Sequence, residues 1–252
     1  MRHPIFVILL SMLATPLFSQ TEATSIYAEF RYVNVPKEKA DLYNLFGLTQ
    51  YKVYADGQFL KFETYQEIPL QDPNTKGPTL RTSFIKERET NEIYLCVSLD
   101  SLSIRMKAGA AERSSFQQTT QAFNSGGKSV RAIGNRQLGI QGYSCVELIV
   151  AGKFSDNISA FVTDQIQLAP SIRDFPLFIG STEKTYGLML GRDELVKGQI
   201  LELRAVALEV NQPKNLYAEL ATYQLVTQEQ GDVMMKSLLT RMMGPSGGGG
   251  KN

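Results

Sequence analysis

Cysteine and histidine, the side chains that most often perform covalent or metal chemistry, are rare in this chain. It has two cysteines, Cys96 and Cys145, and one histidine, His3. Beyond the first few residues there is no imidazole to activate a serine or cysteine nucleophile or to bind zinc or copper. The sequence also has no Gly-x-Ser-x-Gly motif, no phosphate-binding Gly-Lys-Ser/Thr loop and no Cys-x-x-Cys pair. It therefore predicts a protein with no enzymatic activity, no metal site and no cofactor.

Pairs of carboxylates offer the remaining route to catalysis, because the chain contains 25 Asp and Glu residues. A hydrolase that uses two carboxylates is the enzymatic alternative. Glu147 and Asp164 are two candidates that stand in strand-like text. Charged residues in strands usually face solvent. We expect both to be outward-facing side chains.

The C-terminal text "GDVMMKSLLTRMMGPSGGGGKN" carries a sulfur-rich stripe. Asp232 is placed to cap a helix, and Gly244-Pro245 to end it. Apolar residues recur between them with the helical period: Met234, Met235, Leu238, Leu239, Met242 and Met243. Thioether sulfur is a soft ligand for copper(I), but flexible methionines more often pack on apolar surfaces. We predict an amphipathic helix that docks on the sheet or on a partner protein, followed by a disordered Gly-rich tail.

The N-terminus has the pattern of an export signal. Arg2 precedes an apolar run over residues 5–14, and Ser19-Gln20 offers a cleavage site. The run is shorter than the roughly 20 residues of a membrane-spanning helix. The mature protein is expected in the periplasm or outside the cell, or associated with the outer membrane without spanning it. The predicted parts are a signal peptide (1–19), a β-rich domain (20–228) and the Met-rich helix with its tail (229–252).

Charge is almost balanced, with 26 Lys and Arg against 25 Asp and Glu. Nucleic-acid binding needs a concentrated positive surface. We therefore expect no nucleic-acid partner.

Alternation with a period of two dominates the remaining sequence. In "TSIYAEFRYV" (24–33), Ile26, Ala28 and Phe30 share one face of a strand. Asp56-Gly57 is a strong hairpin signal between two such runs. Before the C-terminal stripe, only the segments 36–47 and 115–123 have a sequence pattern that predicts a helix. The predicted fold is mostly β, one curved antiparallel sheet with two or three short helices.

Three blocks follow one another in the second half: "IQGYSCVELIV" (140–150), "AFVTDQI" (160–166) and "YGLMLGRDELVKGQILELRAVALEV" (186–210). Their order resembles the GLPGLI-type and related uncharacterised exported bacterial proteins. Phe161-Val162 stands where those proteins have an aromatic pair, which is a departure. The residues that match the pattern are Gly142, Tyr143, Cys145, Thr163, Asp164 and Gly187.

The resemblance implies a lipoprotein-carrier-like half-barrel, in which a curved sheet and short helices enclose an apolar concavity. The relatives have no established enzymatic activity. The chain contains 13 Phe and 11 Tyr residues, and such a concavity would hold an acyl chain. The alternative is that these aromatic side chains simply fill the core.

Export bears on the cysteines, since an even number in an oxidising compartment usually means pairing. In "EIYLCVSL" Cys96 lies opposite the aliphatic face, and in "CVELIV" Cys145 does the same. We predict a disulfide between them; two separate buried thiols are the alternative.

The expected function is that of a non-enzymatic, exported protein of the cell envelope. Its partner is an apolar small molecule or lipid, such as an acyl chain, or another envelope protein. A structural subunit that attaches through the Met-rich helix is an alternative, and the carboxylate-dependent hydrolase is a more remote one.

Overall fold

The computed structural model describes residues 20–35, 50–68, 77–124, 130–150, 158–180, 184–196 and 199–243. Three predicted features lie outside these residues: the signal peptide over 1–19, the helix over 36–47 and the Gly-rich tail from residue 244 onward.

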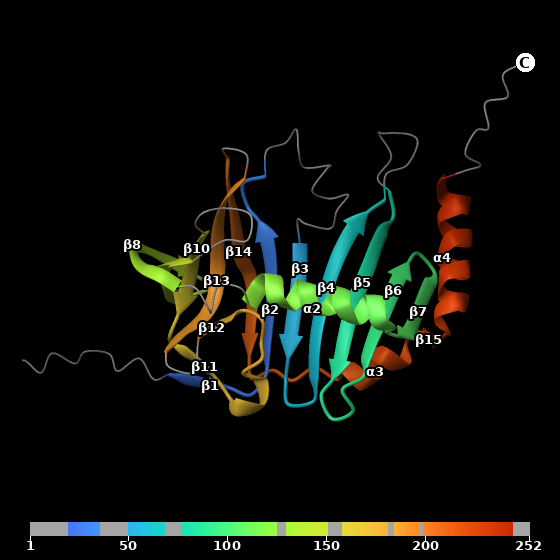
Figure 1. Ribbon diagram of the computed structural model, residues 1–252, viewed down its shortest axis with the longest axis horizontal. Helices are drawn as coiled ribbons and strands as arrows, with labels where there is room; N and C mark the ends of the chain where they lie inside the picture. Colours follow the sequence, from blue (N-terminus) through green and yellow to red (C-terminus); the bar gives the residue numbers. More distant parts are fainter. Residues whose placement is uncertain are drawn as a thin grey trace, which may run out of the picture.

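One large sheet organises the described part of the chain (Figure 1). Its order is β15-β7-β6-β5-β4-β3-β2-β14-β13-β10-β9-β8, and β12 pairs with β13. All neighbours are antiparallel except β15 and β7, and the short β1 and β11 form a separate parallel pair. The strands are β1 (Thr21–Ala23), β2 (Ile26–Tyr32), β3 (Gln50–Ala55), β4 (Phe59–Glu67), β5 (Thr79–Glu87), β6 (Ile93–Leu99), β7 (Leu102–Lys107), β8 (Val130–Ile140), β9 (Tyr143–Val150), β10 (Ile158–Thr163), β11 (Ile166–Leu168), β12 (Phe178–Gly180), β13 (Thr185–Val196), β14 (Gln199–Val210) and β15 (Gln224–Leu225).

Helices cover parts of this sheet without closing it. They are α2 (Ala110–Asn124), the 3₁₀ turn η1 (Pro170–Ile172), α3 (Leu216–Ala221) and α4 (Gln228–Met243). In Figure 1, α2 crosses the strands from β2 to β5, and α4 stands beside the β7 end of the sheet. The sheet is curved and is not closed into a barrel. The predicted class, mostly β with a few short helices, is confirmed.

The hairpin at Asp56-Gly57 is confirmed, and its geometry shows why aspartate is needed. Asp56 Oδ1 accepts hydrogen bonds from the backbone N–H of Gln58 (2.8 Å) and of Phe59 (2.7 Å). The Tyr54 hydroxyl donates to the other carboxylate oxygen at 2.7 Å. These bonds satisfy the turn between β3 and β4 and fix the register of both strands.

Antiparallel pairing sorts the side chains of β2 to β7 onto two different faces. Cross-strand pairs such as Ala28–Val53 and Phe62–Phe84 place the apolar residues together on one face. Pairs such as Glu29–Lys52 and Glu63–Ser83 place the polar residues on the other. We call these the apolar face and the polar face; α2 covers the first, and α3 packs on the second.

Helix α2 begins at Ala110, five residues before the predicted start. The sequence there is small and polar, so it lacks the apolar period from which a helix is recognised. Among the described residues, no helix is both long and apolar enough to cross a membrane.

Candidate functional site

An aromatic row crosses the apolar face beneath α2. The ring centroids of Phe30 and Tyr51 lie 5.5 Å apart and those of Tyr51 and Phe62 lie 5.8 Å apart, both pairs stacked. Phe62 pairs across the strands with Phe84, whose ring is 5.8 Å from that of Phe116 on α2. We call the four strand residues Phe30, Tyr51, Phe62 and Phe84 the aromatic row; Phe116 on α2 packs against its β5 end. The row therefore runs over β2, β3, β4 and β5 and ends against the helix.

Phe116 is the main apolar anchor of α2 in the described part of that helix. Its side chain is 4% exposed, whereas its neighbours Ser115 and Gln117 are exposed. A polar helix of 15 residues is marginal in water on its own. Its folding therefore depends on contacts such as the one between Phe116 and Phe84.

The aromatic row is not recognisable as a set in the sequence. The period-two alternation shows that Phe30 and Phe62 lie on apolar strand faces. It does not show which strands are neighbours, and the row exists only because β2, β3, β4 and β5 follow one another in the sheet.

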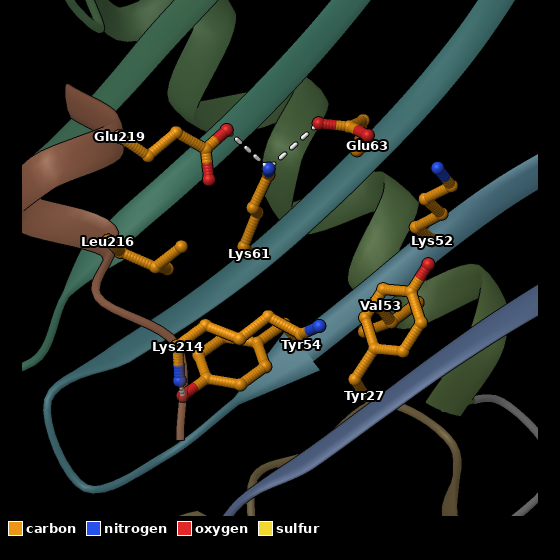
Figure 2. Close-up of a pocket in the computed structure, with 9 residues that line it drawn as sticks. All are labelled: Tyr27, Lys52, Val53, Tyr54, Lys61, Glu63, Lys214, Leu216 and Glu219. Atoms are coloured by element: carbon orange, nitrogen blue, oxygen red, sulfur yellow. Dashed lines mark hydrogen bonds and ion pairs between the residues drawn. The ribbon is translucent and has the colours of Figure 1, made fainter. Parts of the chain in front are cut away.

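The opposite, polar face carries a small hollow under α3 (Figure 2). It encloses about 40 Å³, enough for no more than a few water molecules. Its lining residues are Tyr27, Lys52, Val53, Tyr54, Lys61, Glu63, Lys214, Leu216 and Glu219.

Lys61 occupies the centre of this hollow, and two glutamates balance its positive charge there. Its Nζ lies 2.8 Å from Glu63 Oε2 and 2.6 Å from Glu219 Oε1. Burial alone would raise the pKa of Glu63, but the Lys61 ammonium and the hydroxyls of Tyr65 and Ser83 outweigh it and hold that pKa below its usual value. The same carboxylates raise the pKa of Lys61 in spite of its burial. Lys61, Glu63 and Glu219 thus form an ion-pair cluster inside the hollow, and this cluster joins α3 to β4.

A second, partly buried ion-pair cluster lies toward the β8 end of the sheet, with buried carboxylates and an Arg136 side chain that is 48% exposed. Arg136 donates from Nη2 to Glu147 Oε1 at 2.6 Å and from Nη1 to Asp193 Oδ2 at 3.0 Å. Arg204 Nη1 lies 2.7 Å from Asp193 Oδ1. The expectation that Glu147 faces outward is wrong, because its side chain is buried; Asp164 is exposed as expected.

Gly134 explains how Glu147 becomes buried. A Cβ at position 134 would overlap with Glu147 Oε2. The register between β8 and β9 shifts between Ile133 and Gln137, so β8 bulges around the carboxylate. The sequence carries one signal for the burial of Glu147. This acidic residue stands between apolar neighbours, and the preceding strand carries both a glycine and an arginine.

Neither cluster provides the acid and base of a hydrolase. A cation lies between the two carboxylates of each pair, Lys61 in one and Arg136 in the other. The hydrogen bonds of Arg136 are the main cause that holds the pKa of Glu147 below its usual value. A general acid needs a raised pKa, so the lowered pKa values of Glu63 and Glu147 favour a structural role for these two residues.

The predicted disulfide is wrong, because Cys96 and Cys145 are free buried thiols. Cys96 lies on β6 and Cys145 on β9, with β5, β4, β3, β2, β14, β13 and β10 between them. At about 4.8 Å per strand, the two residues are tens of ångströms apart along the sheet, whereas a disulfide needs Cα atoms within about 7 Å. Burial raises the pKa of Cys96 to about 12 and that of Cys145 to about 11.

The residues of the family-like pattern shape turns at one end of β9, β10 and β13. Gly142 (φ 81°) forms the turn before β9, which begins at Tyr143. Gly187 has φ 127°, and a Cβ there would overlap with the carbonyl oxygen of Thr163. Asp164 follows Thr163 in the bend that leads to β11. Positions 142 and 187 therefore need glycine for backbone reasons.

Helix α4 contacts the sheet of its own chain. Met234 and Met235 pack against a buried cluster of Val97, Ile104, Met106 and Val226. Gly231 lies against Met106, and a Cβ there would be 2.5 Å from Met106 Cε and would displace the end of that side chain. The side chains of Leu238, Leu239, Met242 and Met243 lie outside the described part. At Met234 and Met235, the methionines cover the β7 end of the sheet.

Potential metal ligands are scattered over the described part of the chain. Within those residues, no three His, Cys, Asp or Glu side chains are arranged to hold a metal ion.

No protein-family model and no curated protein matches the sequence. Among solved structures, the fold has a TM-score of 0.40 to PNGF-II, with 10% identity over 85% of this chain and 33% of that chain. The chain thus spans about a third of the length of PNGF-II. The TM-score to an uncharacterized conserved protein from Thermus thermophilus is 0.35, with 10% identity over 82% of this chain and 91% of that chain. The TM-score to MucB is 0.26, with 12% identity over 80% of this chain and 58% of the MucB chain. Similarity at this level carries no information on function.

Proposed function

We propose that this protein is an exported, non-enzymatic protein of the cell envelope that binds an apolar ligand, such as an acyl chain, between α2 and the apolar face of its sheet. The resemblance to GLPGLI-type exported proteins belongs to this proposal, as does a location in the periplasm or outside the cell. The ligand takes the place of contacts that α2 makes with the aromatic row.

One observation carries the proposal: a polar helix lies over an aromatic row and is anchored there by Phe116. Aromatic rings offer large apolar area to a ligand, and α2 rather than a closed barrel covers that area. Moving α2 exposes apolar area of the row, which is buried in the free protein, and an acyl chain restores the lost burial.

Attachment to a partner through the Met-rich helix is the weaker alternative. Met234 and Met235 already contact the chain's own sheet. A partner would first have to displace them.

A contact-quenching experiment tests the proposal directly, because the chain has no tryptophan. Phe116→Trp places one reporter under α2, and Tyr217→Trp places one on α3, where the side chain is 49% exposed on the opposite side of the sheet. A brominated fatty acid quenches only tryptophans that it touches.

We expect saturable quenching at micromolar ligand in the Phe116→Trp variant and little quenching in the Tyr217→Trp variant. Equal quenching of both reporters indicates non-specific adsorption and contradicts the proposal. If neither is quenched, the aromatic residues fill a closed core, and a role in protein interaction is favoured instead.

A further inference from the structure

Charge is distributed very unevenly over the apolar face of β2 to β7. The pairing of these strands places one charged side chain on it, that of Lys86 on β5. The other members of this face are Ile26, Ala28, Phe30, Tyr32, Tyr51, Val53, Ala55, Leu60, Phe62, Thr64, Gln66, Leu80, Thr82, Phe84, Ile93, Leu95, Val97, Leu99, Leu102, Ile104 and Met106.

Lys86 lies where the aromatic row meets the start of α2. Its cross-strand neighbours are Leu60 on β4 and Ile93 on β6, both buried. Phe84, two residues earlier on the same face, contacts Phe116. The carbonyl of Ile93 accepts a hydrogen bond of 2.8 Å from Ala108 N–H, just before the helix. A group bound at Lys86 would therefore sit at one end of the row.

The ammonium of Lys86 has no ion pair with any carboxylate in the described part of the chain. In contrast, Lys52, Lys61, Lys107 and Lys214 each pair with glutamate. Lys86 is half-buried, and its side chain leaves the sheet on the apolar face. A long lysine stem on apolar surface with its amine in water is a common arrangement, and this is the alternative that a test must separate from ligand binding.

We propose that Lys86 determines the ligand class: it binds the anionic head group of a single-chain amphiphile, such as a long-chain fatty acid, whose chain lies along the aromatic row. This inference rests on the proposed function. The row covers three strand steps from β5 to β2, about 15 Å at the usual strand spacing. A head group at Lys86 would thus direct the chain across Phe84 and Phe62 beneath α2. A charge-assisted hydrogen bond at a partly desolvated lysine favours an anion over a neutral group of the same shape.

Matched ligands and variants separate the head-group contact from binding of the chain. The ligands are hexadecanoic acid, hexadecyl phosphate and hexadecanol, each competing with the brominated fatty acid in the Phe116→Trp protein at pH 8. The variants, made in that protein, are Lys86→Met, Lys86→Arg and the control Lys107→Met, which removes an exposed amine from the polar face.

We expect the parent protein to bind at least one of the two anions about tenfold more tightly than the alcohol. Lys86→Met should abolish this preference and leave the affinity for the alcohol unchanged, whereas Lys86→Arg and Lys107→Met should keep it. Whichever anion binds more tightly identifies the head group as a carboxylate or a phosphate.

Equal affinity for acid, phosphate and alcohol in the parent protein overturns the role of Lys86, and so does a preference that survives in Lys86→Met. In both cases, binding of the ligand's acyl chain along the aromatic row is still supported. If none of the three ligands displaces the quencher, the proposed function fails as well, so the two failures are distinguishable.

Discussion

At the scale of residues, the cysteines show what strand phase does and does not reveal. The alternation of "EIYLCVSL" and "CVELIV" correctly places Cys96 and Cys145 opposite the aliphatic side chains of their strands. By register, both lie in the phase of the polar residues, with Ser83 opposite Cys96 and Glu147 two residues after Cys145. Phase is a local property, but a disulfide also depends on the order of strands in the sheet. That order is set by contacts between distant segments, which one sequence does not display.

We predict that both thiols are free and unreactive in the native protein. Iodoacetamide should modify neither residue in native buffer, because each is fully buried and has a raised pKa. In denaturant without reductant it should modify both, which mass spectrometry of the labelled peptides detects. A peptide that joins Cys96 to Cys145 would restore the disulfide and refute the strand order.

Glu63 is predicted to make stability depend on acid. Its folded-state pKa is lowered from the ordinary value of 4.5, mainly by Lys61 acting against the cost of burial. It therefore stabilises the protein above that pH, and the stabilisation is lost as the pH falls below it. Glu63→Gln should lower the free energy of unfolding at pH 7 by roughly 1–3 kcal/mol and flatten its decline in acid.

Urea unfolding at a series of pH values measures this effect, with Glu22→Gln as a control because Glu22 is exposed. An acid dependence in Glu63→Gln as steep as in the wild type would show that the ion pair with Lys61 does not contribute to stability.

At the scale of elements, α2 is the feature on which the account depends. Its existence was expected from the sequence over 115–123, but its extent and its position across β2 to β5 were not. The described side chains of the helix include few buried apolar residues, so its position depends on Phe116 and on the hydrogen bond from Ala108 N–H to the Ile93 carbonyl rather than on a pronounced apolar stripe.

Removing the anchor should release α2 from the sheet. In Phe116→Ala, we expect the amides of residues 110–120 to exchange with deuterium much faster, because the helix is marginal without its contact to Phe84. The amides of β4 and β5 should remain protected. Hydrogen exchange followed by mass spectrometry makes the comparison, with Ser115→Ala as the exposed control on the same helix. Unchanged protection of α2 would mean that other contacts hold it.

Helix α4 is predicted to stabilise the β7 end of the sheet. Replacing Met234 and Met235 by alanine removes half-buried side chains that pack on Ile104 and Met106. The double variant should lose about 1–3 kcal/mol of stability, whereas Val233→Ala, at a side chain that is 64% exposed, should lose almost none. Denaturant unfolding curves decide this. If the wild type, the double variant and Val233→Ala unfold at the same denaturant concentration, α4 docks on a partner rather than on its own sheet.

At the scale of the whole molecule, the sequence was most informative about the class of fold. Alternation between apolar and polar residues predicts many strands, and Asp56-Gly57 predicts one hairpin correctly. The position of Glu147 was not predicted, because its burial requires Arg136 and Gly134 on the neighbouring strand. The candidate binding face was missed for a similar reason: the aromatic row and Lys86 come together only through the order of β2 to β5.

The central claim is that an apolar ligand with an anionic head binds between α2 and the aromatic row. Native mass spectrometry of the protein, purified without detergent from cells of its own species, tests it most directly. The account predicts a fraction of molecules with one bound amphiphile, which is released on gentle activation and identified by its mass, and loss of that fraction in Lys86→Met. Protein that carries no ligand, and that takes up none when hexadecanoic acid and hexadecyl phosphate are added, would contradict it.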